Sequence, residues 1–293
     1  MSSIAKYIVA GLSATAVVSA YPQDSGVATA SGAANSAASA SFAVPTISQP
    51  ATATPAASSA AAAASAANVA LAKEALQAVT NVGRFNALLT VDGDGQELLD
   101  DATLRSRLVF DYGARAAPLG MGGRFILANQ NNFPILVNQG ISTAVGFLNP
   151  CSMNSPHTHP RATEFFTVVQ GKFKTGFMLE NGFLANATER RQTTQVSVQE
   201  LGPFQATVFP LGSIHYQFND QCEPATFIAT FNSADPGTSQ VAQNYFFLNE
   251  QVVNITLGEI NQVDGSNIEQ FRTSLPANLV QAVDSCLSKC GLD

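Results

Sequence analysis

Two stretches decide the fold: His157-Thr158-His159-Pro160-Arg161-Ala162-Thr163-Glu164 and, further along, Pro210-Leu211-Gly212-Ser213-Ile214-His215. Together they contain all three histidines of the chain. Imidazole nitrogens and a carboxylate oxygen form a ligand set that a first-row divalent metal accepts, with positions left open. The sequence therefore predicts one metal site, with the ligands His157, His159, Glu164 and His215.

The spacing in the first stretch suits two strands joined by a turn. Side chains two residues apart on a strand point to the same face, so His157 and His159 can reach one ion together. Glu164 would face the other way on an unbroken strand. Pro160 cannot donate to a strand ladder, however, and the residues after it favour a turn. Glu164 can then open a second strand that points back to the same interior.

The second stretch supplies a ligand from a third strand. Residues 209–212 form a turn signal, after which His215 heads a strand with Gln217 and Asn219 on its face. Short alternating segments separated by turns run from about residue 124 to about residue 232. That pattern is typical of a closed all-β fold, in which ligands from different strands meet inside one barrel.

Both stretches resemble the sequence boxes of germins, a branch of the cupin superfamily. The pattern reads His-x-His-x4-Glu-x6-Gly and then Pro-x-Gly-x2-His-x3-Asn, carried by residues 154–164 and 209–219, and residues 231–237 resemble the segment that follows. The ending Cys286-Leu287-Ser288-Lys289-Cys290-Gly291 is similar to that of secreted spherulin-like proteins of fungi and slime moulds. The resemblance covers about residues 69–291.

What the resemblance implies is a single double-stranded β-helix barrel with flanking helices at both ends. It implies a manganese ion held by His157, His159, Glu164 and His215, and it places Asn154 near the metal as a residue that is not a ligand. Because the C-terminal helices of germins pack between subunits, it also implies a homo-oligomer, a dimer or a hexamer. A small anionic substrate is the expected partner.

Two positions depart from the germin pattern. Oxalate-oxidising germins carry a second asparagine thirteen residues before the first ligand, and an ungapped match from Gly140 onward puts Ala144 there. This argues against oxalate oxidation. Phe204 stands where the second box usually has a turn glycine. Since Gly202 and Pro203 lie just upstream, we expect this turn to be shifted rather than lost.

The identity of the metal follows less directly. Copper, nickel and zinc bind such a site more tightly than manganese does, so affinity alone does not select manganese. The carboxylate and the open positions favour Mn(II) or Fe(II), and the resemblance favours Mn(II). Fe(II), Cu(II), Ni(II) and Zn(II) stay open as alternatives. Because neutral imidazoles are needed, metal binding should weaken below about pH 6.

Three functions are compatible with this site. The first is a manganese oxidoreductase of the superoxide dismutase or oxalate oxidase type, acting on superoxide or a small carboxylate. The second is a non-catalytic extracellular or cell-wall structural protein whose metal stabilises the barrel. The third is a sugar- or acid-binding cupin. The third function is disfavoured. Oxalate decarboxylases, the acid-converting cupins to compare, are usually two-barrel proteins, whereas this chain shows one metal motif.

The N-terminal residues predict export. Residues 1–20 read as a signal peptide, with Lys6, an apolar run at residues 8–18 and the small-residue site Val18-Ser19-Ala20. The run is short for a membrane anchor, which is the alternative. The net charge of −7 and the absence of Lys/Arg runs argue against nucleic acid or an anionic membrane as partner. We expect a secreted protein, extracellular or associated with the cell wall.

Composition divides the rest of the chain in two. Residues 21–67 are rich in Ala, Ser, Thr and Pro and predict a disordered linker, either a glycosylated stalk or a plain spacer or processed propeptide. Its alanine run at residues 60–67 can continue into the helix expected at residues 69–80. Residues 68–293 form the germin-like domain. Within it we expect an early strand at 108–112, a barrel core at about 105–250 and C-terminal helices at about 255–290, including residues 268–289.

Cysteines and sequons fit an exported protein. Four cysteines suggest two disulfides, with three pairings open. We favour Cys151 with Cys222, because each flanks a metal-binding strand, which leaves Cys286 with Cys290. Asn186-Ala187-Thr188 and Asn254-Ile255-Thr256 are N-glycosylation sequons.

Overall fold

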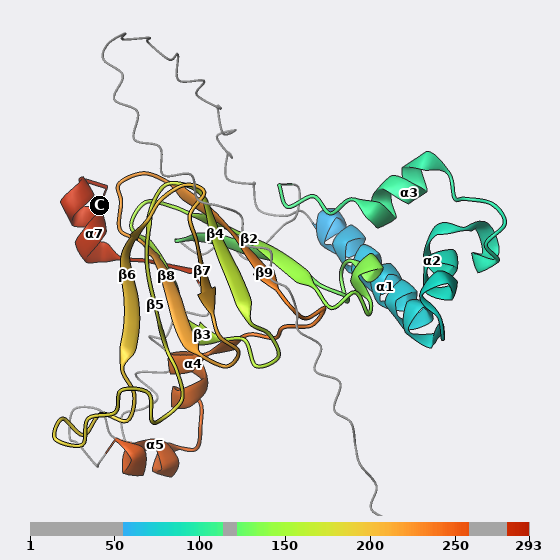
Figure 1. The fold of residues 1–293 in the computed structure, drawn as a ribbon. Helices are drawn as coiled ribbons and strands as arrows, with labels where there is room; N and C mark the ends of the chain where they lie inside the picture. Colours follow the sequence, from blue (N-terminus) through green and yellow to red (C-terminus); the bar gives the residue numbers. More distant parts are fainter. Residues whose placement is uncertain (1–54, 114–121, 258–279, 293) are drawn as a thin grey trace, which may run out of the picture. The chain divides into compact units, whose positions relative to one another are not determined.

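Two antiparallel sheets face each other in the described part of the chain (Figure 1). The computed structural model describes residues 55–113, 122–257 and 280–292. The strand order of the first sheet is β1 (Gly123–Ala128), β2 (Ser142–Leu148), β9 (Ala225–Phe231), β4 (Glu164–Gln170) and β7 (Ala206–Phe209). The order of the second is β10 (Ser239–Gln240), β3 (Ser152–Thr158), β8 (Ile214–Asn219), β5 (Phe173–Met178) and β6 (Gln195–Leu201). The short strand β11 (Val280–Ala282) also pairs with β3.

The core lies between the two sheets, as the alternating sequence predicts. Every second residue of β9 is buried, from Ala225 to Phe231, because successive side chains of a strand point to opposite faces. Aromatic rings cross from one sheet to the other: the Phe166 and Phe173 ring centroids are 5.5 Å apart, as are those of Phe173 and Phe227. The predicted all-β architecture is confirmed.

Helices precede the sheets in the chain: α1 (Pro55–Gln77), α2 (Asn81–Leu89) and α3 (Asp101–Leu108), with the short 3-10 turns η1 (Val91–Gly93) and, after β1, η2 (Pro134–Leu136). Thr80 caps α2 by accepting a hydrogen bond from the Gly83 amide, and Asp100 caps α3 in the same way. A small apolar cluster joins α1, α2 and the end of η2 through Ala72, Ala75, Leu88 and Val137.

Helix α1 begins at Pro55, inside the range that composition assigns to the linker. Alanine has the highest helix propensity, so the alanine run extends the predicted helix of residues 69–80 toward the N-terminus. Residues 55–67 are therefore helical in the structure, which corrects the predicted disorder of that part. The predicted signal peptide and residues 21–54 of the linker lie outside the described residues. No described helix combines the length and apolar character needed to cross a membrane.

The early strand predicted for residues 108–112 is wrong. Leu108 ends α3, and the following residues form no strand. Their apolar side chains pack locally instead: the Phe110 ring lies 5.4 Å from that of Phe133, and the Tyr112 hydroxyl donates to the Thr143 carbonyl at 3.1 Å. The strands accordingly begin at Gly123, as predicted from the alternating segments that start near residue 124, and later than the outer bound of the barrel core near residue 105.

The C-terminal region mixes helix and strand. Helices α4 (Val241–Phe246) and α5 (Glu250–Thr256) follow β10, and α7 (Asp284–Cys290) precedes the C-terminus. The helix predicted over residues 268–289 is correct only for α7, and its residues 268–279 lie outside the described part. Within the predicted helical range, Val280–Ala282 form strand β11 instead, because they pair with the edge of β3.

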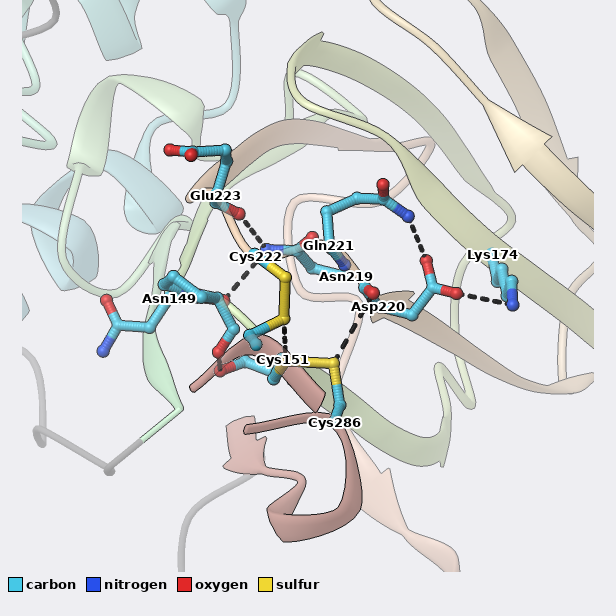
Figure 2. Close-up of a disulfide and its surroundings, with 12 residues drawn as sticks. Asn149, Cys151, Lys174, Asn219, Asp220, Gln221, Cys222, Glu223 and Cys286 are labelled. Atoms are coloured by element: carbon cyan, nitrogen blue, oxygen red, sulfur yellow. Dashed lines mark hydrogen bonds and ion pairs between the residues drawn. A yellow bond between two sulfur atoms is a disulfide. The ribbon is translucent and has the colours of Figure 1, made fainter. Parts of the chain in front are cut away.

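Two disulfides attach α7 to the sheets, with a pairing that corrects our expectation (Figure 2). Cys151 pairs with Cys286, and Cys222 pairs with Cys290. Cys286 and Cys290 lie four residues apart on α7, so they share one helix face. That face meets the turn before β3 and the turn after β8, where each helical cysteine finds a separate partner.

The turn before β7 is not shifted, contrary to expectation. The Gln205 amide donates to the Gly202 carbonyl at 3.1 Å, with Pro203 second in the turn. Phe204 holds the third position with a φ of 62° and is 88 % exposed. Phenylalanine therefore adopts the left-handed conformation for which germins use glycine, at a cost of about 1–2 kcal/mol.

Candidate metal centre

The two histidine-bearing strands β3 and β8 are neighbours, and His157 lies opposite His215 in their register. A bulge between Asn154 and His157 shifts this register. Without it, residues three apart would face opposite sides of the sheet; the extra residue allows both side chains to be buried inward. The bulge thus places Asn154 on the same side as the ligands.

Turns bring in the other two side chains. His159 follows the end of β3, and its backbone carbonyl accepts a hydrogen bond from Gly212, in the turn that precedes His215. Glu164 is the first residue of β4, after a break at Pro160. Asn232 holds that break in place, since its side chain accepts a hydrogen bond from the Thr163 amide at 2.9 Å. Glu164 therefore points back to the histidines, as predicted.

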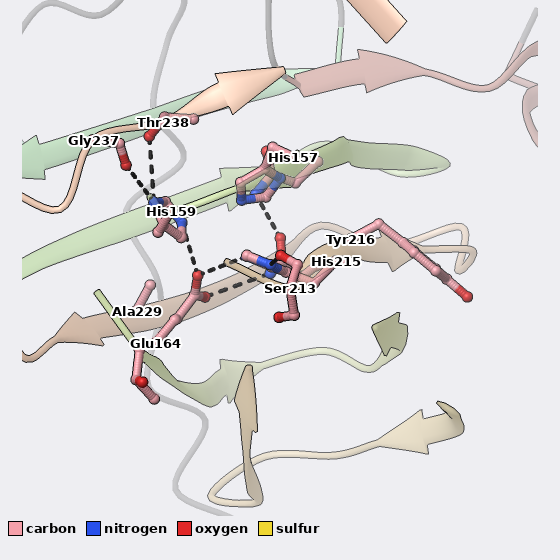
Figure 3. Close-up of polar contacts among 12 residues, drawn as sticks. His157, His159, Glu164, Ser213, His215, Tyr216, Ala229, Gly237 and Thr238 are labelled. Atoms are coloured by element: carbon pink, nitrogen blue, oxygen red, sulfur yellow. Dashed lines mark hydrogen bonds and ion pairs between the residues drawn. The ribbon is translucent and has the colours of Figure 1, made fainter. Parts of the chain in front are cut away.

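All four predicted ligands meet in one buried cluster (Figure 3). Their ligand atoms lie within 4.8 Å of one another, close enough to share one ion. Each side chain is at most 2 % exposed, and they come from β3, the turn after it, β4 and β8. The fold therefore brings together the four residues that the sequence predicts: His157, His159, Glu164 and His215.

Backbone carbonyls fix the tautomer of every histidine. His157 Nδ1 lies 2.7 Å from the Ser155 carbonyl oxygen, and His215 Nδ1 lies 3.0 Å from that of Ser213. His159 Nδ1 lies 2.6 Å from the carbonyl oxygen of Gly237. Because a carbonyl can only accept, each Nδ1 carries the proton and donates it. In the neutral imidazoles, each Nε2 is left with its lone pair free to bind a metal.

These lone pairs converge on a carboxylate, an arrangement that calls for a cation. Glu164 Oε2 lies 3.0 Å from His159 Nε2 and 3.1 Å from His215 Nε2. Within the described part of the chain, the buried His159 Nε2 has no hydrogen-bond partner of acceptable geometry. Acceptors that face acceptors in a buried space repel one another unless a positive charge lies between them. The residues present therefore fit a divalent metal.

Electrostatics keep the cluster in its metal-binding protonation state. Burial, with the neighbouring His215 as the next cause, lowers the pKa of His157 to about 3, so this imidazole is neutral at ordinary pH. Burial by itself raises the pKa of Glu164, but the adjoining side chains of His159 and His215 outweigh it and hold that pKa at about 2. The carboxylate is ionised and supplies the negative charge of the site.

A chain of amides leads from the ligand carboxylate to Asn154. The side-chain nitrogen of Gln217 lies 3.5 Å from Glu164 Oε1, and the Gln217 oxygen accepts a hydrogen bond from Asn154 Nδ2 at 2.5 Å. Asn154 Oδ1 is buried and has no partner among the described residues. Asn154 thus lies beside the site, as the resemblance implies. Sequence reasoning placed Gln217 on the correct face but did not assign it to the site, although its position two residues after His215 carries that information.

Aromatic rings form an apolar wall of the site, next to the apolar core. The Phe209 ring stacks on His215 with centroids 4.5 Å apart, and Phe231 lies 4.5 Å from His159. Ala144 is fully buried in the apolar core and pairs with Ala229 of β9. No polar group therefore stands at position 144.

The glycosylation predictions stay predictions. Asn186 is half-buried in a turn, where its Oδ1 accepts a hydrogen bond from the Glu189 amide. Asn254 belongs to α5, but its side chain lies outside the described part.

Comparison with known proteins defines the class. A family model described as cupin matches residues 118–269. With the two facing sheets and the buried cluster of three histidines and a glutamate, this match shows that the chain belongs to the cupin family.

Individual relatives narrow the likeness to the spherulins. The chain is 36% identical to spherulin-1B of Physarum polycephalum over 204 residues, covering 68% of this chain and 74% of the relative. Spherulin-1A of the same organism is also 36% identical, over 190 residues, covering 64% and 71%. Germin-like protein 4-1 of Oryza sativa subsp. japonica is 34% identical over 147 residues, covering 50% of this chain and 55% of the relative. The predicted germin and spherulin resemblance is confirmed.

A search of solved structures found an oxalate oxidase at 22% identity with a TM-score of 0.47, covering 63% of this chain and 92% of that one.

Proposed function

We propose that the protein is a secreted, manganese-binding germin-like cupin that acts as an oxidoreductase on superoxide or a small carboxylate. One observation carries the proposal: three imidazole nitrogens with free lone pairs and one ionised carboxylate converge in a buried cluster. An ion with this ligand set keeps open positions for a small anion. Manganese is favoured over Fe(II), Cu(II), Ni(II) and Zn(II) by the carboxylate ligand and by the germin resemblance.

The protein's own residues would hold the ion and limit what reaches it. His157, His159 and His215 offer Nε2, and Glu164 offers Oε2; a bound manganese would supply Lewis acidity and one-electron transfer. Gln217 fixes the carboxylate by donating to its other oxygen, and Asn154 in turn fixes Gln217.

Of the two substrates, the surroundings favour superoxide. A dicarboxylate would need a second polar anchor, and position 144, where oxalate-oxidising germins have an asparagine, is a buried alanine. The rings of Phe209 and Phe231, which pack on His215 and His159, offer no hydrogen-bond donor. Such a site therefore suits a small anion with a single charge, such as superoxide.

The test is reconstitution of the purified chain with Mn(II), after elemental analysis of protein secreted by a native-like host. Superoxide dismutation should appear with Mn(II), disappear on chelation and be absent from the His215→Ala variant. Oxalate consumption should be weak or absent. Metallated protein that is inactive toward both substrates contradicts the proposal.

A structural role is the second candidate, favoured by complete burial of the ligands. In that case the metal would chiefly link β3, β4 and β8, in an extracellular or cell-wall protein with no turnover. Chelation would then lower the melting temperature sharply while no activity is found, and an unchanged melting temperature would exclude this role.

Export and assembly remain proposals. Two disulfides, together with the predicted signal peptide, support a secreted protein. Recovery of the chain in the culture medium, cleaved after residue 20, tests this. The dimer or hexamer implied by the germin resemblance is tested by sedimentation velocity.

A further inference from the structure

The two disulfides of the protein touch each other. Cys151–Cys286 and Cys222–Cys290 lie side by side where α7 meets the sheets, as Figure 2 shows for the labelled cysteines. The sulfur of Cys151 is 3.5 Å from the sulfur of Cys290, although these two cysteines are not bonded to each other. A thiolate at either position would therefore have the other disulfide within contact distance.

Solvent reaches the two bonds unequally. Cys222 is exposed and Cys290 is half-buried. Cys151 is fully buried, and Cys286 is 8 % exposed. Disulfide exchange requires that an attacking thiolate reach a sulfur atom, so an external thiol can open the outer bond at Cys222 but cannot reach Cys151 directly.

We propose that Cys222 is a thiol-reactive site from which reduction passes inward through Cys290 to the buried bond. A low-molecular-weight thiol, as its thiolate, attacks the Cys222 sulfur. A mixed disulfide forms there, the Cys222–Cys290 bond breaks, and the electron pair leaves on Cys290. The Cys290 thiolate then attacks the Cys151 sulfur, which forms Cys151–Cys290 and releases Cys286 as a thiolate.

The reaction balances with two external thiols. The second thiol attacks the mixed disulfide at Cys222, so that the external pair leaves as an oxidised disulfide and Cys222 becomes a thiol. The protein gains two electrons and two protons and ends with one bond, Cys151–Cys290, and two thiols, Cys222 and Cys286. The Cys286 sulfur lies 3.5 Å from the Asp220 carbonyl oxygen, which can accept the hydrogen bond of the new thiol.

Releasing Cys286 loosens a specific part of the fold. Strand β11 and α7 follow each other directly, and β11 pairs with β3 at Ser152, Met153 and Asn154. In the starting state, the Cys151–Cys286 bond holds the first turn of α7 close to the beginning of β3. After exchange the tether runs from the last residue of α7, so β11 loses its nearest covalent anchor.

Two single variants of the full chain test the proposed contact. C222S leaves Cys290 as the free thiol beside Cys151, whereas C290S leaves Cys222 free and keeps the inner bond. Each protein is held near the ordinary cysteine pKa, quenched in acid, denatured and labelled with a maleimide, and its disulfides are mapped by mass spectrometry. We expect C222S to contain a Cys151–Cys290 peptide and label on Cys286, and C290S to carry label on Cys222 alone. Label confined to Cys290 in C222S, or equal scrambling in both variants, overturns the proposal.

Limited reduction of the unmodified protein gives an independent test that needs no variant to fold. The protein is treated with sub-stoichiometric dithiothreitol, and separately with glutathione, and trapped by the same acid quench. The first species that has gained two electrons should carry label on Cys222 and Cys286 and retain a Cys151–Cys290 bond. Label on Cys222 and Cys290, with Cys151–Cys286 intact throughout, overturns the proposal.

Discussion

The paired strands β3 and β8 each carry one metal ligand at one end, and a cysteine flanks each strand at the other end. His157 lies opposite His215, while at the far end Ser152 lies opposite Asn219 and the Cys151 amide donates to the Gln221 carbonyl. At the first end, the glutamate carboxylate and the neutral imidazoles converge on one point. At the second end, two disulfides connect the strands' flanking turns to α7. The same strand pair is thus held at both ends by unrelated chemistry, which means that each end can be broken separately.

Breaking the metal end should have the largest effect. In His215→Ala, one ligand is removed and Glu164 loses a neighbour, so metal affinity should fall by at least roughly a hundredfold. Metal content per chain, measured by elemental analysis after dialysis, checks this. Thr175→Val, a buried substitution on the adjacent strand β5, should keep its metal. Equal metal content in His215→Ala and the parent protein would contradict the site.

Acid should destabilise the metal-free protein through the same end. The pKa of His157 is about 3 in the folded state against 6.5 ordinarily, so the unfolded chain binds the additional proton between these values. The contribution of the neutral His157 to the free energy of unfolding is therefore complete above about pH 6.5. It is lost as the pH drops toward 3, by on the order of 3–5 kcal/mol. Urea unfolding of chelated protein across this range measures it. A free energy of unfolding that does not change with pH would show that His157 is not buried as a neutral group. His157→Gln is the control, because its free energy of unfolding should depend less steeply on pH.

Breaking the disulfide end should cost stability and leave the metal in place. The double variant C222S/C290S removes a cross-link between residues 68 positions apart, which should lower the free energy of unfolding by about 2–4 kcal/mol. Denaturant unfolding measures the loss, and elemental analysis of the same sample should show unchanged metal. Loss of the metal would mean that the two ends of the strand pair are coupled.

Gln217 sharpens the comparison, because it lies along β8 between the two ends. Gln217→Leu removes the donor to Glu164 and the acceptor for Asn154, so metal affinity should fall by roughly 10- to 100-fold. Competition with a chelator of known affinity measures the change. Gln195→Leu is the matched control, because the Gln195 side chain is exposed on β6 and donates to the Tyr216 hydroxyl, away from the ligands. An equal effect in both variants would point to general destabilisation.

The smallest expected effect lies away from both ends, at Phe204. Phe204→Gly relieves the left-handed backbone conformation and should stabilise the protein by about 0.5–1 kcal/mol, net of the greater freedom of glycine in the unfolded chain. Thermal unfolding measures it. Phe204→Ala removes the ring but keeps the strain, so its melting temperature should change little. A gain in the alanine variant equal to that in the glycine variant would assign the cost to the exposed ring instead.

Sequence predicted the ligands well because the information is local. Histidines two residues apart, a proline break and a glutamate define their directions through strand periodicity, and the structure places them as expected. The strand expected at residues 108–112 failed because apolar residues there pack against Phe133 instead of joining a sheet. Strand β11 was missed for the converse reason: the open edge of β3 determines its conformation, and that edge is not visible from residues 280–282.

By itself, the sequence determined the fold class and the four ligands, which are three imidazoles and one carboxylate. These depend on residue type and on the short-range period of a strand. Only the tertiary structure decided which cysteines pair, that the hydrogen bonds of Gln217 join Asn154 to the ligand Glu164, and that Phe204 adopts a left-handed turn. Each of these depends on where distant segments come to lie, which spacing along the chain does not specify. The cysteines are an example, because α7 presents two of them on one face to two different turns.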